Sequence, residues 1–434
     1  MKKIYKGNII FTKEMQAFEE HKNSYIVIND GTVEGIFETL AKEYEDYSVT
    51  DFGDSMIIPG FNDLHVHAPQ WLNMGIGYSE ELLPWLEKYT FPLESAFADT
   101  DFAKVNYQRF IDDMVNCGTT RACIFATRHL EATQILIDLL REKGIGAYVG
   151  KVNMDRNSSA SLQEDTQASI DETLILAKRD AEYARAEAEK GRQALVRYIL
   201  TPRFVPSTTP KLMKALAEIA QEFDLPVQSH LDENKSEIAW VKELHPECES
   251  FTSVYKDYGL IMPGKTIMAH CVHNNDDEIK IIIDNNIYVA HCPQSNMNLT
   301  SGIMPLRKYL DLGINVGLGS DVSGGHTLNM AAHITEAINS SKAYHSFYPQ
   351  YAPLSTSEAF YIATKGSGSF FGKVGSFEVG YDFDALVIDD KDILYGQSYD
   401  TLQERLEKYL YTGTPDNITH RFVKGNEIAN SVSD

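Results

Sequence analysis

The sequence has few cysteines, few prolines and no long apolar run. Its 434 residues include five cysteines, an odd number that is spread widely and contains no C-x-x-C pair. This usage argues against a disulfide framework and suits free thiols, so we expect a cytoplasmic protein. Nowhere do about 18 apolar residues follow one another, so we expect no membrane-spanning helix. The N-terminus also lacks the apolar segment of a secretory signal.

Basic residues are scarce relative to acidic ones. The chain has 39 Lys and Arg against 62 Asp and Glu, which gives a formal net charge of −23. Such an excess repels the phosphate backbone of nucleic acids and anionic membrane surfaces, so we expect neither as a partner. Hydrophobic residues make up 43% of the chain and charged residues 23%, which excludes wholesale disorder. A neutral or cationic small substrate stays compatible with this charge.

Short apolar segments alternate with longer helical patterns through the middle of the chain. Such alternation is typical of repeated β-α units with a parallel sheet. Eight strands are expected within about 265 residues, which is the size of a (β/α)8 TIM barrel. The expected strands are residues 55–64, 119–126, 146–153, 196–201, 226–230, 266–271, 287–291 and 315–320.

Both ends of the chain are rich in β patterns. Residues 24–31 and 32–37 read as a hairpin joined by an Asn-Asp-Gly turn. Residues 380–389 and 419–428 have a similar apolar pattern near the other end. Because chain termini often lie close together, we expect these segments to form a small β-sandwich domain. The expected domains are a sandwich of residues 1–57 and 373–434 and an α/β barrel of residues 58–372.

A long segment rich in Ala, Glu and Arg separates the third and fourth expected strands. It covers residues 158–192 and ends near a glycine, which favours one long helix. Ser158 or Ser159 is the expected N-cap, since serine side chains accept hydrogen bonds from the first free backbone N–H groups.

Histidine and aspartate gather where the expected strands end. Because side chains at the carboxyl ends of barrel strands line the active-site mouth, these residues should lie close together. His65 and His67 are two apart on one strand, so both imidazoles point to the same face and can share a metal. The residues at these ends are His65, His67, His230, His270, His291 and Asp321. Imidazole nitrogen and carboxylate oxygen are donors that suit Zn²⁺ or Fe²⁺.

Each of these residues alone also has a structural explanation. His230 and His291 could be hydrogen-bonded core histidines, and Asp321 could cap the segment that follows it. Cys271 and Cys292 directly follow strand-end histidines, so on an extended strand they should face the opposite side. The occurrence of His or Asp at the same end of five strands favours a shared site over these separate explanations.

The residues around these strand ends resemble the amidohydrolase superfamily. Pro59-Gly-Phe-Asn-Asp-Leu-His-Val-His67 is similar to its P-G-F-x-D-x-H-x-H opening, and the later histidines and aspartate follow in its order. Within the superfamily the chain resembles the guanine deaminase family over residues 58–372. The segments that carry this second resemblance are 67–70 (HAPQ), 201–204 (TPRF), 229–234 (SHLDEN), 268–270 (MAH), 291–296 (HCPQSN) and 317–325 (GLGSDVSGG).

The resemblance implies a hydrolase that converts guanine and water to xanthine and ammonia. It implies one Zn²⁺ per subunit, with Fe²⁺ less favoured, held by His65, His67, His230 and Asp321. Binuclear members of the superfamily carry a metal-bridging lysine at the fourth strand, where this sequence has Thr201-Pro-Arg203 instead. A single metal is therefore expected, with Lys151 in a structural role. Members of the family are often dimeric, so a homodimer is expected.

The resemblance also implies roles for the residues around the metal. Glu233 would pass protons between water, the purine ring and the leaving amine. His270 would polarise the attacking water, and Asp321 would accept its proton. A bound zinc ion supplies the acidity for such a reaction, because it lowers the pKa of water from about 15.7 to near 7.

Substrate recognition is expected from Gln70, Arg203, Phe204 and His230. Arginine offers a planar fork of donors that suits the O6 and N7 acceptors of guanine. Glutamine both donates and accepts, so Gln70 can read an amide-like edge, and Phe204 offers a surface for stacking. Alternatively, Arg203 could pair with a surface carboxylate and Phe204 could belong to the core.

Two other functions stay open at this point. The chain could be an amidohydrolase that deaminates a different aminopurine, a pterin, a pyrimidine or a triazine with the same metal cluster. From another class, it could be a non-catalytic barrel that serves as a scaffold, although it retains the full set of metal-type residues together with Glu233.

Overall fold

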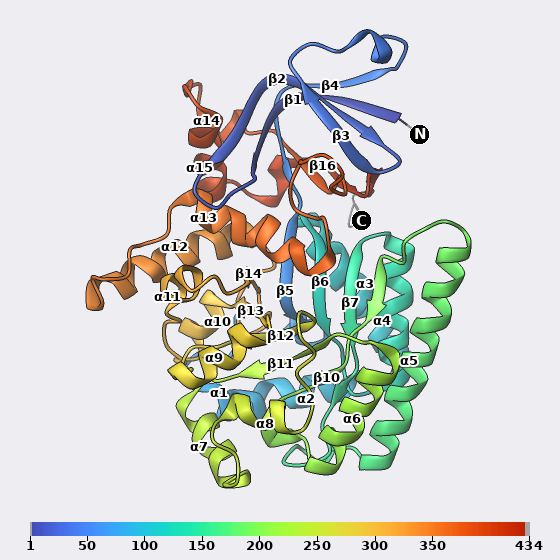
Figure 1. Cartoon of the computed structure of the whole chain (residues 1–434), viewed down its shortest axis with the longest axis vertical. Helices are drawn as coiled ribbons and strands as arrows, with labels where there is room; N and C mark the ends of the chain where they lie inside the picture. Colours follow the sequence, from blue (N-terminus) through green and yellow to red (C-terminus); the bar gives the residue numbers. More distant parts are fainter. Residues whose placement is uncertain (1, 430–434) are drawn as a thin grey trace. The chain divides into compact units, whose positions relative to one another are not determined.

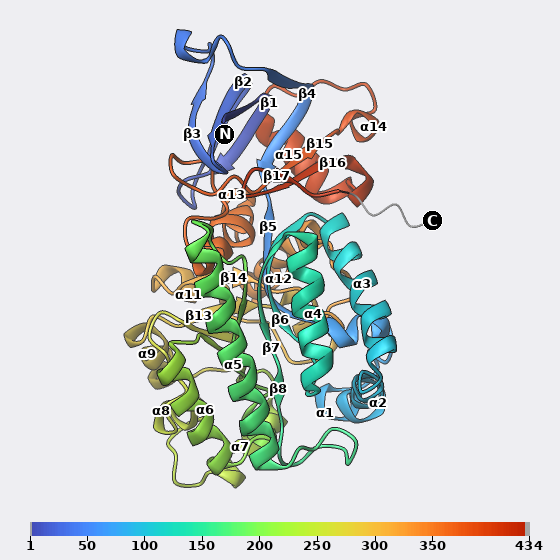
Figure 2. The ribbon, with the colours of Figure 1, turned by 90° about the vertical axis from the view of Figure 1, so that its right-hand side faces the viewer.

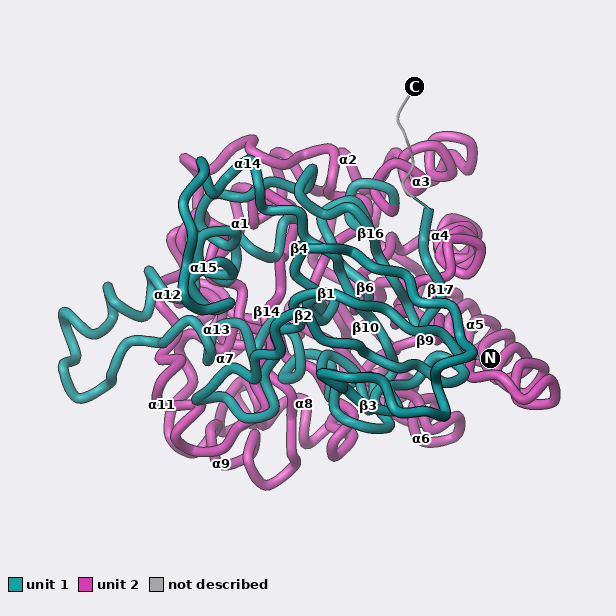
Figure 3. Tube along the Cα trace, turned by 90° about the horizontal axis from the view of Figure 1, so that it is seen from above, with its two compact units in different colours: residues 1–63, 112–121, 328–434 teal, residues 64–111, 122–327 magenta. Residues whose placement is uncertain are grey.

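The computed structural model describes residues 2–429. The chain divides into two compact units, which are coloured separately in Figure 3. One unit comprises residues 1–63, 112–121 and 328–434, and the other comprises residues 64–111 and 122–327. The sequence-based division placed residues 328–372 with the barrel, whereas they group here with the chain ends.

The first unit contains a seven-stranded sheet built from both ends of the chain (Figure 1). Its order is β17-β16-β15-β4-β1-β2-β3, and β1 and β4 are the parallel neighbours in this otherwise antiparallel sheet. The expected pairing of the two ends is therefore confirmed. The strands are β1 (Lys2–Thr12), β2 (Phe18–Asn29), β3 (Thr32–Phe37), β4 (Val49–Pro59), β15 (Ala385–Ile388), β16 (Ile418–Val423) and β17 (Asn426–Glu427).

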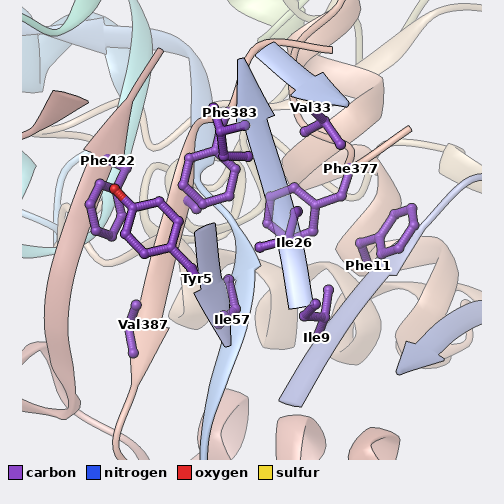
Figure 4. Close-up of a cluster of buried hydrophobic side chains, with 12 residues drawn as sticks. Tyr5, Ile9, Phe11, Ile26, Val33, Ile57, Phe377, Phe383, Val387 and Phe422 are labelled. Atoms are coloured by element: carbon purple, nitrogen blue, oxygen red, sulfur yellow. The ribbon is translucent and has the colours of Figure 1, made fainter. Parts of the chain in front are cut away.

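A cluster of aromatic and aliphatic side chains forms a hydrophobic core in this unit (Figure 4). The ring of Tyr5 lies 5.4 Å from that of Phe383 and 4.9 Å from that of Phe422, which joins β1 to the C-terminal segments. The hairpin between β2 and β3 turns at Asp30 and Gly31, whose φ values are 47° and 83°. This left-handed pair matches the turn that the Asn-Asp-Gly sequence predicts.

Helices of the first unit follow in the C-terminal third of the chain. They are α12 (Met330–Phe347), α13 (Thr356–Tyr361), α14 (Lys391–Leu394) and α15 (Leu402–Thr412). The N-caps of α13 and α15 are Ser355 and Thr401. The side chain of each accepts a hydrogen bond from the backbone N–H of the N3 residue in a capping box.

Parallel strands form the centre of the second unit. They make two four-stranded sheets, β5-β6-β7-β9 and β11-β12-β13-β14, and a two-stranded pair of β10 and β8. The strands are β5 (Phe61–His67), β6 (Thr119–Phe125), β7 (Gly146–Gly150), β8 (Val152–Asn153), β9 (Val196–Tyr198), β10 (Thr201–Pro202), β11 (Val227–Leu231), β12 (Thr266–His270), β13 (Tyr288–His291) and β14 (Val316–Leu318). Each of the eight expected strands overlaps one or two of these.

The first expected strand is divided differently from the prediction. Residues 55–59 belong to β4 of the terminal sheet, and β5 begins only at Phe61. Gly60 lies between them, where a Cβ atom would come within 2.3 Å of the Thr120 side chain. This close approach requires glycine, and it explains why one apolar run serves two sheets.

Helices α4 and α5 lie beside the parallel strands of the second unit (Figure 2). Helix α4 contacts β7, and helix α5 contacts β9. The helices are α1 (Leu82–Trp85), α2 (Phe91–Ala96), α3 (Thr100–Asn116), α4 (Leu130–Lys143), α5 (Thr166–Glu189), α6 (Pro210–Phe223), α7 (Lys235–Leu244), α8 (Phe251–Asp257), α9 (Asp276–Asp284), α10 (Pro293–Asn298) and α11 (Leu306–Asp311). Across residues 2–429, helices long and apolar enough to span a membrane are absent.

Helix α5 begins later than the sequence predicts. Its N-cap is Asp165, whose carboxylate accepts hydrogen bonds from the backbone N–H groups of Gln167 and Ala168 at 2.9 and 3.0 Å. The predicted caps Ser158 and Ser159 are therefore wrong. Residues before Asp165 instead follow β8 as a loop, because Glu164 turns inward to pair with the buried Lys151.

Candidate active site

Four side chains, from the strands β5 and β11 and from the loop after β14, converge on one point. One ligand atom from each of His65, His67, His230 and Asp321 lies within 4.8 Å of all the others. The Nε2 atom of His67 is 3.2 Å from that of His65 and 3.2 Å from that of His230. The Oδ1 atom of Asp321 lies 3.1 Å from His65 Nε2 and 3.3 Å from His67 Nε2. The sequence-based cluster is thus brought together in space.

Hydrogen bonds orient two of the histidines in this cluster. His230 Nδ1 lies 2.6 Å from the backbone carbonyl oxygen of Arg203 and donates to it, so Nε2 presents its lone pair to the cluster. His270 Nδ1 likewise donates to Asn296 Oδ1 at 2.9 Å. Partners that fix the tautomer in this way are typical of metal-binding histidines.

Burial keeps the imidazoles of the site neutral. It lowers the pKa of His65, His230 and His270 below the usual value and that of His67 to about 4. Burial alone would raise the pKa of Asp321, but the adjacent His65 and His67 hold it well below its ordinary range. At neutral pH the cluster therefore consists of neutral imidazoles and an ionised carboxylate, which is the form that binds a metal.

Glu233 lies beside this cluster at the end of the loop that leaves β11. Its Oε2 is 3.4 Å from His270 Nε2, and its Oε1 accepts a hydrogen bond from Ser301 Oγ at 3.0 Å. Burial, together with the charge of Asp321, raises the pKa of Glu233 to about 8. A carboxyl group in this state can give and take a proton near neutral pH.

A cavity of about 400 Å³ joins the cluster to the predicted recognition residues. Gln70, Arg203 and Phe204 line it together with His67, His230, Glu233, His270 and Asp321. Leu82, Trp85, Leu86 and Leu299 add apolar surface, and Glu237 adds a second carboxyl group. The lining thus combines apolar surface with polar and ionisable groups, as in small-molecule sites.

The partner of Arg203 is a residue that the sequence did not single out. Glu94 on α2 is buried and accepts two hydrogen bonds from Arg203, at 2.7 Å from Nη1 and 3.0 Å from Nη2. Gln70 Nε2 donates to the same carboxylate at 2.9 Å. The alternative that Arg203 pairs with a surface carboxylate is therefore wrong, since its partner lies inside the protein.

Three other residues that the sequence singled out are absent from the described lining of the cavity. The Nζ atom of Lys151 pairs with Glu164 and Glu172, which fits its structural interpretation. His291 is buried but is absent from the described lining of the cavity. Cys292 does not face away: its Sγ groups with His65, His270 and Asp321, because β13 ends at His291 and strand alternation ends with it.

Ser301 and Glu237 were also missed by the sequence reasoning. Ser301 lies outside the quoted motifs, and its hydrogen bond to Glu233 joins residues 68 positions apart. Glu237 had a usable signal, because it stands three residues after Asn234 in the pattern of a capping box. That box is formed in the structure at the start of α7.

Comparisons with known proteins agree with this arrangement. The model of the amidohydrolase family matches residues 56–428. A guanine deaminase from Dictyostelium discoideum is 40% identical over 454 residues, covering 98% of each chain. The crystal structure of a guanine deaminase from C. acetobutylicum, with guanine bound in its active site, is 49% identical with a TM-score of 0.94, covering 99% of this chain and 100% of that one. The guanine deaminase of E. coli is 28% identical with a TM-score of 0.87, covering 99% of both.

The architecture and the metal-type cluster are those of a hydrolase with a site at the ends of parallel strands. The chain belongs to the amidohydrolase family and, within it, to the family of guanine deaminases.

Proposed function

We propose that the protein is an enzyme that hydrolyses guanine to xanthine and ammonia. The observation that carries this proposal is the single cavity that joins the His and Asp cluster and Glu233 to Gln70, Arg203 and Phe204. Full-length relatives named guanine deaminase, one of them with guanine in its active site, support it. A different cyclic amine as substrate, or a scaffold without activity, has no comparable support.

We propose that one Zn²⁺ binds to His65, His67, His230 and Asp321. Members of the amidohydrolase family are metal-dependent, and the donors are neutral imidazoles and an ionised carboxylate. A bound zinc ion would supply Lewis acidity and lower the pKa of water. We propose no second metal, because Lys151, the candidate bridging lysine, is paired with Glu164 and Glu172. The same donors accept Fe²⁺, and metal analysis of the purified protein distinguishes the two ions.

The chain's own residues would handle the protons of the reaction. Water adds its oxygen to C2 of guanine, the bond from C2 to the exocyclic nitrogen breaks, and ammonia leaves. Glu233 would carry protons to the purine ring and to the leaving nitrogen through Oε2, with Ser301 holding Oε1. His270 would face the attacking water through Nε2, which is buried without a hydrogen-bond partner. Asp321, held ionised, would accept the proton of the water.

The predicted recognition residues would hold the purine. Arg203 uses one hydrogen of each Nη atom on Glu94, which leaves its other N–H groups for the O6 and N7 acceptors of guanine. Gln70 would read the amide edge, Phe204 would pack against the ring, and His230 would border the substrate from the metal side. The apolar residues Trp85 and Leu86 would exclude bulk water.

We propose further that the parallel strands of the second unit close into the (β/α)8 barrel. Backbone hydrogen bonds join the outer strands of the two sheets: Asp321 N donates to His65 O at 2.7 Å, and Gln228 N donates to Leu200 O at 2.9 Å. By the same proposal the terminal sheet folds over its aromatic core as a sandwich of residues 1–57 and 373–434, with the barrel at 58–372.

The assembly and location of the protein are also proposed. We propose a homodimer, which sedimentation of the zinc-loaded protein tests, with a monomer as the contradicting result. The five cysteines, all within residues 2–429, form no disulfide with one another, so we propose a reducing compartment, the cytoplasm.

A substrate panel tests the proposed activity. The zinc-loaded protein is incubated with guanine, adenine, a pterin, cytosine and an aminotriazine, and ammonia release is measured for each. Guanine should give the highest kcat/KM, with xanthine as the product. Turnover of another amine without turnover of guanine would assign the protein to a different substrate. No turnover of any amine would favour the scaffold.

A further inference from the structure

Glu94 is a buried carboxylate that accepts hydrogen bonds from two of the predicted recognition residues, Gln70 and Arg203. It is 1% exposed and Arg203 is 3% exposed, so water does not screen the pair. The carboxylate accepts hydrogen bonds from Nη1 and Nη2 of Arg203 and from Nε2 of Gln70, at distances of 2.7 to 3.0 Å. Phe91, on the same helix as Glu94, lies 5.0 Å below the guanidinium.

These contacts fix the direction of the donors that face the cavity. Two hydrogen bonds from Arg203 to the Glu94 carboxylate fix the plane of the guanidinium, because a bidentate pair of this kind is directional. Gln70 is held at both ends, since its Oε1 also accepts a hydrogen bond from the backbone N–H of Ser323 at 3.3 Å. Without Glu94, both side chains would lose the partner that orients them.

Glu94 also balances the charge of Arg203 beside the cavity. Arg203 is always protonated, so the pair of Arg203 and Glu94 is neutral overall. A buried charge that loses its partner is strongly unfavourable and attracts a replacement. The replacement available in this cavity is an anionic purine. Xanthine carries an oxo group where guanine carries an amine, and it is the more acidic of the two, so the product ionises more readily than the substrate.

We propose that Glu94 is a positioning residue that fits the cavity to neutral guanine and prevents retention of the xanthine anion. This inference rests on the proposed function. By orienting Arg203 and Gln70 it lowers the KM for guanine, and by neutralising Arg203 it keeps product inhibition weak as xanthine ionises.

Two substitutions separate these roles. Glu94→Gln keeps the size of the side chain but removes its charge, whereas Glu94→Asp keeps the charge and shortens the reach. Glu164→Gln is the matched control, because Glu164 is also a buried partner of a cation, Lys151, but does not line the cavity. Zinc content is measured for each variant, so that a lost metal is not mistaken for lost recognition.

Both variants should raise the KM for guanine by about tenfold or more, since hydrogen bonds between charged groups are lost. In Glu94→Gln the ratio of the xanthine inhibition constant to the guanine KM should fall by about tenfold at slightly alkaline pH. In Glu94→Asp and in the control, this ratio should stay at the wild-type value. An unchanged KM in Glu94→Asp overturns the positioning role, and an unchanged ratio in Glu94→Gln overturns the charge-balancing role.

The wild-type protein provides a test that needs no variant to fold. Xanthine inhibition is compared with that of hypoxanthine, which stays neutral over the same range, from slightly acid to slightly alkaline pH. Inhibition by xanthine should weaken relative to hypoxanthine as pH rises. Relative strengthening overturns the proposal. Wild-type protein that does not convert guanine would instead overturn the proposed function, before any variant is compared.

Discussion

Arg203 contributes to the candidate site through both its main chain and its side chain. Its carbonyl oxygen accepts the Nδ1 hydrogen of His230, and its guanidinium borders the cavity. The residue that orients a proposed metal ligand is therefore also the residue proposed to read the purine. Under the proposed roles, this arrangement would tie the position of the substrate to the position of the metal without any additional residue.

At the same scale, Glu233 gives a direct test of the proton-transfer role. Glu233→Gln keeps the size of the side chain and can still accept from Ser301, but it cannot carry a proton. We expect kcat to fall by about 10²- to 10⁴-fold, the usual contribution of general acid-base catalysis. Zinc content should not change, because Glu233 is not in the proposed ligand set.

Glu243→Gln is the control for Glu233→Gln, since Glu243 is exposed on α7 outside the cavity. It should leave kcat within twofold of wild type, on the order of experimental scatter. A Glu233→Gln variant with wild-type kcat and full zinc content would exclude Glu233 as the proton carrier.

The residues that sequence reasoning could find are those with a local signature. His65 and His67 share a strand face, His230 and His270 lie at the ends of apolar strands, and Asp321 follows such a strand closely, so pattern and spacing revealed them. Glu94 has no such signature, because its contacts with Gln70 and Arg203 span 24 and 109 residues. A contact of that kind is decided by tertiary packing, which a single sequence does not display.

At the scale of single elements, the start of α5 gives a test of stability. Asp165→Ala removes the carboxylate that caps two backbone N–H groups. The free energy of unfolding should fall by about 1 kcal/mol, as for other N-cap replacements. Chemical denaturation of the zinc-loaded protein measures the change.

Ser158→Ala is the control for this cap, because the sequence alone favoured that serine. Its hydroxyl donates to the carbonyl of Arg156 in a loop and does not cap the helix. The unfolding free energy should change by less than about 0.5 kcal/mol. A larger loss of unfolding free energy in Ser158→Ala than in Asp165→Ala would contradict the observed start of α5.

The start of α7 gives a test that depends on pH. Burial, and then the nearby Glu233, raise the pKa of Glu237 from 4.5 to about 8. A carboxyl group whose pKa is raised on folding does not weaken the fold at low pH, where it is protonated in both states. As pH rises towards 8 it ionises more readily in the unfolded state, so the free energy of unfolding falls. Glu237→Gln can still accept from the backbone of Glu233 and Asn234, but it does not ionise.

Relative to wild type, Glu237→Gln should therefore gain stability as pH rises from 4.5 to 8. The gain should be at most about 1.4 kcal/mol per pH unit. Unfolding free energies measured at several pH values, with Glu243→Gln as the exposed control, test this slope. A difference that stays constant with pH would show that Glu237 is not held protonated.

Strands were more predictable than helix starts and strand boundaries. Short apolar segments identified each parallel strand because buried parallel strands are apolar on both faces. The division of residues 55–67 into β4 and β5 was not visible, because it depends on the close approach of Gly60 to Thr120. The start of α5 was missed for a similar reason, since Glu164 is drawn inward by Lys151.

At the scale of the whole molecule, the acidic charge of −23 is consistent with a small neutral substrate. The groups that decide the chemistry are few and buried, and their charges nearly balance locally: Arg203 with Glu94, and Asp321 with the metal that it would bind. The net charge therefore describes the exposed surface, whereas the residues proposed to choose the substrate are a small number of interior ones.

Guanine turnover as a function of bound zinc tests the central claim most directly. The protein is stripped of metal with a chelator, metal content is measured, and xanthine formation is followed as zinc is added back. The account predicts no turnover in the metal-free protein and full recovery at one zinc per chain. Full activity in protein verified to be free of metal, or no xanthine from protein carrying one zinc per chain, would contradict it.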